Sequence, residues 1–214
     1  MRERPFRRLS STLAVCAGFL ATWTCGMTLA DLQIERIFGP ETPSGSYKHA
    51  SSITELDNGD LLLAFYSRMG NLQAAVVELD PGHLLALCRR GGDYEPGNDG
   101  YVVRTESHDA GRTWSPGLET EFPNPNASVE LIKLRSGTLL FIYNHSMHER
   151  SPLRAVASTD GGRTWPRQLD LASGDGSFSY PTAIQTSDGR IHVTFTSDGR
   201  TVLRHAIFSE ADLR

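Results

Sequence analysis

Short stretches in which apolar and polar residues alternate recur along the chain, and four of them share one form. Each has a first strand, a tight turn ending in Gly, and a second strand rich in Leu, Val, Ile or aromatic residues. Glycine permits the positive φ that such turns need. The pattern predicts an all-β chain containing four antiparallel hairpins, whose turn glycines are Gly59, Gly82, Gly137 and Gly189.

A second pattern, S-x-D-x-G-x-T-W, occurs as SHDAGRTW and again 51 residues later as STDGGRTW. We expect its Asp to accept hydrogen bonds from backbone N–H groups two residues on, its Gly to allow a tight turn, and its Trp to be buried between neighbouring sheets. We therefore interpret these residues as structural rather than catalytic. They are Ser107, Asp109, Gly111 and Trp114 in the first copy and Ser158, Asp160, Gly162 and Trp165 in the second.

The spacing of the turn glycines defines a repeat. The intervals are 23, 55 and 52 residues, and the last two agree with the 51-residue repeat of the octapeptide. A hairpin, a third strand (101–107 or 153–158), the octapeptide and a fourth strand form a propeller blade. The first interval lacks about 30 residues needed for a third and fourth strand. The sequence thus predicts a gap near residues 68–72, a strand over 201–208, and an incomplete propeller.

The first 30 residues differ from the rest of the chain. Four Arg precede an apolar run over 13–23, and small residues lead to Ala30. These features predict a signal peptide, residues 1–30, cut after Ala30, and a secreted or periplasmic protein whose propeller domain is 31–214. The apolar run is too short to span a membrane, and no later run is long enough.

Charge, cysteine and histidine content argue against a nucleic-acid partner, a cysteine nucleophile and a metal site. Residues 1–30 hold four of the 21 basic and one of the 25 acidic side chains, so the remainder has 17 and 24 and a net charge of about −7. That balance argues against nucleic acid as a partner. Cys88 lies in an apolar run and is expected in the core rather than as a nucleophile. The seven His are scattered singly, so no metal site is predicted, and no cofactor is expected.

The octapeptide resembles the Asp-box, or BNR repeat, of the sialidase (neuraminidase) superfamily, and residues 45–214 are most similar to its neuraminidase-like branch. The resemblance implies a six-bladed β-propeller, of which this sequence holds about four blades' worth. In the family, three Arg bind the sugar carboxylate, a Tyr attacks the sugar, a Glu takes the Tyr proton, and an Asp is the acid/base.

Three family positions are matched by residue type. Tyr180 lies nine residues before Gly189, where the family has its catalytic Tyr, although a Tyr there could also serve only in packing. Arg89, seven after Gly82, matches the second family Arg or is a solvated strand edge. Arg150, in the sequence RSPL, matches the third, with Arg154 as its competitor.

Two family positions carry other residues. Gln73 stands nine residues before Gly82, where the family has its Glu, and a neutral amide cannot act as a base. His49 stands ten before Gly59, where the family has its first Arg; it could meet an anion, act as a base, or be structural. The position of the acid/base Asp falls in the predicted gap.

The resemblance implies a secreted glycoside hydrolase of exo-sialidase type that removes a terminal acidic sugar from a glycan. Arg89 and Arg150 would hold the carboxylate, Tyr180 would attack or stabilise the reacting centre, and His49 and Gln73 would complete the wall. One alternative is a non-catalytic glycan-binding protein or inactive remnant, which the short first interval and Gln73 favour. Another is a propeller polysaccharide lyase, in which His and Tyr act on a uronate.

Overall fold

The computed structural model describes residues 49–66, 73–89 and 100–214, and all of them belong to a compact unit that covers residues 38–214. The predicted signal peptide and the predicted gap at 68–72 lie outside the described residues. Strands dominate the described part, which contains two short 3₁₀ helices and no helix able to cross a membrane. The strands are β1 (His49–Glu55), β2 (Leu61–Tyr66), β3 (Ala74–Asp80), β4 (His83–Cys88), β5 (Tyr101–Ser107), β6 (Leu118–Pro123), β7 (Glu130–Lys133), β8 (Leu139–Asn144), β9 (Leu153–Ser158), β10 (Arg167–Ala172), β11 (Ser179–Gln185), β12 (Ile191–Ser197) and β13 (Val202–Phe208), and the 3₁₀ helices are η1 (Asp198–Arg200) and η2 (Glu210–Asp212).

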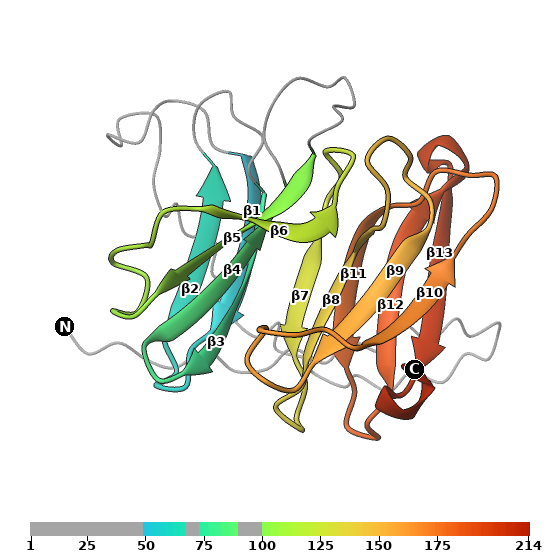
Figure 1. Ribbon diagram of the computed structural model, residues 1–214. Helices are drawn as coiled ribbons and strands as arrows, with labels where there is room; N and C mark the ends of the chain where they lie inside the picture. The colour runs from blue at the N-terminus through green and yellow to red at the C-terminus, as the bar shows by residue number, and fades with distance from the viewer. Residues whose placement is uncertain (1–48, 67–72, 90–99) are drawn as a thin grey trace, which may run out of the picture. The chain divides into compact units, whose positions relative to one another are not determined.

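The strands form four antiparallel sheets in which sequence neighbours pair (Figure 1). The first sheet is β1–β2, the second β3–β6, the third β7–β10 and the fourth β11–β13. This succession of meanders is the blade architecture that the repeat predicts, and it confirms the incomplete all-β propeller. The predicted third strands, 101–107 and 153–158, are β5 and β9, and the predicted 201–208 strand is β13.

Glycine turns close the four predicted hairpins. The φ angles of Gly59, Gly82, Gly137 and Gly189 lie between 78° and 86°, in the left-handed region where a side chain is strained. The first two turns also lie together, because the buried carboxylate of Glu78 accepts hydrogen bonds from the N–H groups of Asp57 and Gly82. The prediction that the first unit is short also holds, since β2 ends at Tyr66 and β3 begins at Ala74.

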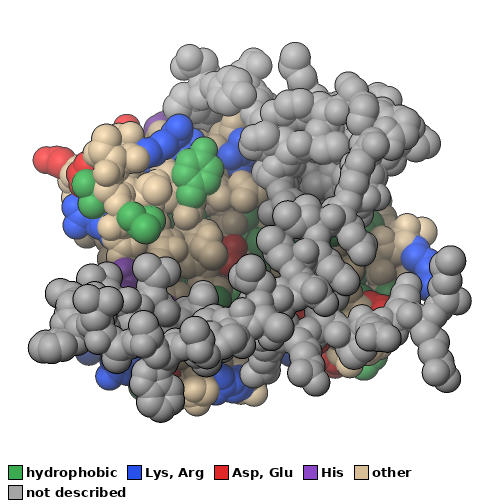
Figure 2. Space-filling view, turned by 180° about the vertical axis from the view of Figure 1, so that it is seen from behind, with side chains coloured by type: hydrophobic (Ala, Val, Ile, Leu, Met, Phe, Trp, Pro, Cys, Tyr) green, Lys and Arg blue, Asp and Glu red, His purple; other side chains and the backbone are tan. Residues whose placement is uncertain are grey.

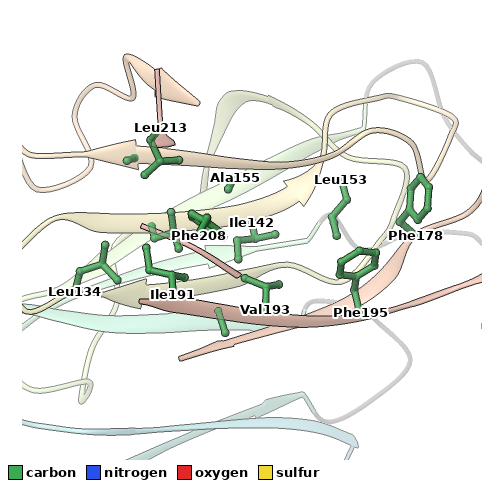
Figure 3. Close-up of a cluster of buried hydrophobic side chains, with 13 residues drawn as sticks. Leu134, Ile142, Leu153, Ala155, Phe178, Ile191, Val193, Phe195, Phe208 and Leu213 are labelled. Atoms are coloured by element: carbon green, nitrogen blue, oxygen red, sulfur yellow. The ribbon is translucent and has the colours of Figure 1, made fainter. Parts of the chain in front are cut away.

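Apolar side chains from consecutive sheets form three cores. The largest joins the third and fourth sheets and includes Ile142, Val193 and Phe195 (Figure 3). A second joins the second and third sheets around Phe141 and Tyr143, and a third involves the first and second sheets. The sheets therefore stabilise one another by stacking face to face, as propeller blades do. Cys88 is buried in the third core, as predicted, and burial raises the pKa of its thiol to about 11.

The two octapeptide turns share most of a hydrogen-bond network, which differs from the predicted one: in each, the Asp carboxylate accepts from the N–H and the hydroxyl of the Thr four residues on. The carboxylate of Asp160 accepts from the N–H groups of Arg163 and Thr164, three and four residues on, and from the Thr164 hydroxyl. The Ser158 hydroxyl, rather than Asp160, accepts from the N–H groups of Asp160 and Gly162. Because the Ser158 hydroxyl already accepts from these inner N–H groups, the Asp160 carboxylate bonds the N–H groups farther along the turn.

The two turn tryptophans have different surroundings. Trp165 packs in the core between the second and third sheets, with its ring 5.7 Å from Phe122 and 6.0 Å from Phe141. Trp114 is 38% exposed, which corrects the expectation that both rings are buried. The reason is the neighbouring sheet: the second copy packs against the four-stranded second sheet, whereas the first copy faces β1–β2, where a Cβ on Gly111 would meet Leu62.

Candidate functional site

In each sheet, one of the two edge strands contacts the corresponding edge strand of a neighbouring sheet. These inner strands are β1, β3, β7 and β11, and neighbouring ones are in contact. Each inner strand runs into a glycine turn, so the four glycine turns lie at one end of the sheets. The starts of the inner strands and the ends of their hairpin partners lie at the other end. Gln73, Arg89 and Tyr180 all belong to that second end, which we call the strand-start end.

The chain leading into Tyr180 is held by its neighbours in the third and fourth sheets. The fully buried Asn144 donates from Nδ2 to the Phe178 carbonyl at 3.1 Å, and the Phe178 N–H donates to the Arg150 carbonyl at 2.8 Å. Thr196 on β12 donates to the carbonyl of Ser179 at 3.1 Å. These bonds leave the backbone of residues 178–179 little freedom and fix where the next side chain points.

Tyr180 itself is exposed and has an unusual backbone. Its φ is 54°, the residue is 44% exposed, and the pairing of β11 with β12 is irregular between Ser179 and Thr182. A non-glycine residue in the left-handed region is strained by about 1–2 kcal/mol. Such strain persists where the surroundings over-determine the conformation, which happens often at functional sites.

Two arginines flank this segment. Arg150 donates from Nη1 to the Ser179 hydroxyl at 2.9 Å. Arg200, in the η1 turn between β12 and β13, has its guanidinium carbon 5.3 Å from the centre of the Tyr180 ring. Sequence reasoning missed Arg200; the Asp-Gly pair before it indicates a tight turn that would have brought it to the strand-start end.

The competing candidate Arg154 has a different role. It lies on β9, and its guanidinium forms two hydrogen bonds, of 2.6 and 3.0 Å, with the carboxylate of Asp170 on β10. Both hydrogen bonds go to one carboxylate of the same sheet, so the Arg154 guanidinium is already paired there. Of the two arginines, the structure therefore brings Arg150 to the Tyr180 segment.

The other predicted site residues belong to the first and second sheets. Gln73 and Arg89, both partly buried, are adjacent, because the Arg89 N–H donates to the Gln73 carbonyl at 3.0 Å. His49 begins β1 and pairs with Tyr66 of β2, and its side chain lies outside the described residues. The structure thus places Arg150 beside Ser179, the residue before Tyr180, and Gln73 beside Arg89, and the roles of these residues stay predictions.

The inner strands also line a groove of about 660 Å³. Glu130, the first residue of β7, lies in it and accepts a 3.4 Å hydrogen bond from the N–H of Ala183 on β11. Burial raises the pKa of Glu130 to about 7, and the Ala183 hydrogen bond opposes that rise. Among the carboxyl groups of the described residues, it is the one whose pKa is raised, so it can exchange a proton near neutral pH.

Exposed apolar and basic side chains also mark the fourth sheet. Figure 2, which views the molecule from behind Figure 1, shows hydrophobic side chains beside Lys or Arg where no grey atoms lie in front. The exposed large apolar residues of the sheet are Tyr180, Ile184, Val202, Leu203 and Ile207. In the propeller architecture such a face packs against another blade.

Comparison with known proteins places this arrangement among the sialidase-type propellers. The NanB sialidase of Streptococcus pneumoniae superposes with a TM-score of 0.60 at 16% identity, over 78% of this chain and 29% of that protein. A Hadza microbial sialidase gives 0.55 at 22% identity, over 76% and 32%. The intramolecular trans-sialidase of Ruminococcus gnavus gives 0.55 at 18%, over 73% and 37%. The likeness shows the fold, and the chain spans about a third of the length of these proteins.

Sequence comparison then identifies the family. The BNR repeat-like domain family matches residues 43–193, more than half of the chain, and the chain belongs to that family. No curated protein matches the chain in sequence.

Proposed function

We propose that this chain carries part of the sugar-binding site of a sialidase-type protein and binds a terminal acidic sugar of a glycan at the strand-start end. The observation that carries the proposal is the environment of Tyr180: an exposed phenol on a strained backbone, with Arg200 over its ring and Arg150 bonded to the adjacent Ser179. Guanidinium groups match a sugar carboxylate in charge and in hydrogen-bond geometry.

In this proposal the residues have separate roles. Arg150 and Arg89 bind the carboxylate, and the Tyr180 oxygen attacks the anomeric carbon or stabilises the positive charge that develops there. Gln73 and His49 contribute to the wall of the site. A neutral tyrosine is suited to an anionic sugar, because it brings no negative charge toward the substrate carboxylate.

A second candidate function is glycan binding without hydrolysis, and Gln73 is the observation that favours it. Its amide cannot take a proton from Tyr180, as the family's Glu does. The two functions share a binding site and differ in whether the glycosidic bond is cleaved.

The experiment that separates them uses a fluorogenic α-sialoside and a matched pair of variants. Tyr180→Phe removes the nucleophilic oxygen and keeps the ring under Arg200. Hydrolysis by the parent chain that is lost in Tyr180→Phe, with unchanged affinity for free sialic acid and an unchanged melting temperature, supports the hydrolase. Binding without cleavage in both proteins supports the second candidate. An absence of sialic acid binding in both contradicts the proposal as a whole.

We also propose that residues 1–30 are removed on export. Mass spectrometry of protein recovered outside the cytoplasm checks this proposal, because a mature chain that begins at Asp31 is expected, and an intact Met1 in exported protein contradicts it.

A further inference from the structure

Three side chains that commonly bind metal ions lie together at the glycine-turn end of the second sheet. The imidazoles of His83 and His108 and the carboxylate of Glu106 each offer a ligating atom within 4.8 Å of the other two. The His83 Nε2 atom lies 2.7 Å from Oε2 of Glu106, and the two imidazole rings stack with their centres 4.2 Å apart. This arrangement corrects the expectation that every His stands alone.

Strand register explains why the three converge. On β4 and β5, Leu85 pairs with Glu106 and Leu84 pairs with Ser107. Side chains alternate between the two faces of a sheet, so Glu106 and His108 share a face, and His83 reaches the same face from the neighbouring strand. The sequence hides the cluster because the hairpin partners are more than 20 residues apart.

The carboxylate of Glu106 is also held in place from behind. Arg104 donates to its Oε1 from Nε at 2.9 Å and from Nη2 at 2.8 Å, and Arg104 also bonds to the Gly162 carbonyl of the second octapeptide turn. Oε1 is therefore fixed, while Oε2 turns toward His83. Outer hydrogen bonds of this kind orient metal ligands in proteins. The side chains of His83 and Glu106 are about a quarter exposed and His108 is exposed, so an ion can enter from solvent.

We propose that His83, Glu106 and His108 bind a zinc ion. Two imidazole nitrogens and one carboxylate oxygen are an established ligand set for Zn²⁺, whose fourth position is then taken by water. Ca²⁺ and Mg²⁺ instead prefer oxygen ligands throughout. Two tetrahedral ligand atoms at ~2.1 Å from zinc are about 3.4 Å apart. The His83–Glu106 pair, now 2.7 Å apart, has to open by less than an ångström to reach that spacing.

The ion would act on stability rather than on the sugar. His83 begins β4, whereas Arg89 follows the end of that strand, so the site lies at the opposite end of the second sheet from the predicted sugar site. Bound zinc would tie the beginning of β4 to the first octapeptide turn, which contains His108. A ligand that binds only the folded state stabilises the chain, and above Kd the stabilisation rises with the logarithm of the ligand concentration.

The test is a competition titration of zinc chloride against a chromophoric chelator, using tag-free protein. The parent chain is expected to bind one zinc ion at this site and to melt at a higher temperature when zinc is present. His108→Ala, a change at an exposed side chain, should weaken that binding at least tenfold and remove the rise in melting temperature. The matched control is His192→Ala with His205→Ala, because these residues form the other stacked His pair, with nitrogens 3.0 Å apart on β12 and β13.

The proposal is overturned if either the parent chain or the variants behave otherwise. One such result is an absence of zinc binding by the parent chain. Another is binding that survives in His108→Ala or is lost in the His192/His205 control. Circular dichroism of each variant checks that the sheets are intact, and Glu106→Gln provides a second variant, which should also weaken binding because it removes the anionic ligand.

Discussion

The guanidinium carbon of Arg200 lies 5.3 Å from the centre of the Tyr180 ring, and both residues have positive φ angles, of 71° and 54°. They come from opposite sides of β12, since Tyr180 is on β11 and Arg200 lies in the turn before β13. Two strained non-glycine residues in contact at one end of a sheet indicate a conformation imposed by the surrounding structure. A cation held against an exposed aromatic ring creates a positive surface beside a flat apolar one, which suits an acidic sugar.

Replacing Arg200 with Gln should therefore weaken the binding of free sialic acid, measured by calorimetry. We expect a loss of about 1 kcal/mol, or about fivefold in Kd, because Arg200 is exposed and its charge is partly screened by water. The free energy of unfolding should change by less than about 1 kcal/mol, the strength of an exposed cation–π contact.

Arg163→Gln is the matched control for Arg200, because Arg163 is an exposed Arg of the second octapeptide turn, which follows the end of β9, whereas Arg150 and the Tyr180 segment lie near its start. Its affinity for sialic acid should equal that of the parent chain. An equal loss of affinity in both variants would mean that net charge, rather than the Tyr180 site, attracts the sugar.

The two octapeptide turns differ at one strained position, and the difference predicts opposite mutational effects. Ala110 in the first turn has φ 57°, and the equivalent residue in the second is Gly161, with φ 72°. Ala110→Gly should stabilise the chain by up to about 1 kcal/mol, since it relieves left-handed strain, and Gly161→Ala should destabilise it by a similar amount. Urea unfolding of the two variants measures both.

Packing does not account for the second effect, because a Cβ on Gly161 would meet only Leu79, at an ordinary contact distance of 3.9 Å. The control is Ala157→Gly, at a β9 position without positive φ, where glycine should destabilise the chain. Stabilisation at both alanines would indicate a general effect of glycine rather than relief of strain at Ala110.

Local patterns predicted the fold well, for a physical reason. Glycine turns and alternating strands depend on residues close in sequence, so the hairpin at Gly137 and the strands β5 and β9 could be read directly. The surroundings of Trp114 could not, because they depend on which strands stand in the neighbouring sheet.

Residues of the candidate site could be predicted only where their position within one hairpin determines which end of the sheet they occupy. Counting from a turn glycine assigned Tyr180 and Arg89 to the candidate site. Arg200 and Glu130 were missed, because their significance comes from contacts across strands or sheets: the ring of Tyr180 for the first, and the N–H of Ala183 for the second. The cluster of His83 with His108 was missed for the same reason.

Glu130 should make the stability of the chain depend on pH. Its pKa is about 7 in the folded chain, against an ordinary value of 4.5, because burial disfavours the charged carboxylate. Between pH 4.5 and 7 the folded chain holds a proton that the unfolded chain has released. The stabilisation is complete below pH 4.5 and is lost as the pH rises through 7, by on the order of 3 kcal/mol.

Glu130→Gln removes this titration and keeps an oxygen that can accept from the Ala183 N–H. Urea unfolding from pH 5 to pH 8 should therefore show a steeper loss of stability in the parent chain than in Glu130→Gln, with the variant more stable at pH 8. Glu149→Gln, at an exposed glutamate, should follow the parent curve. If the parent and Glu130→Gln lose stability in parallel, the proton is not held by Glu130. Glu130 lines the groove between the inner strands, and parallel curves would also remove the reason to assign it any proton transfer there near neutral pH.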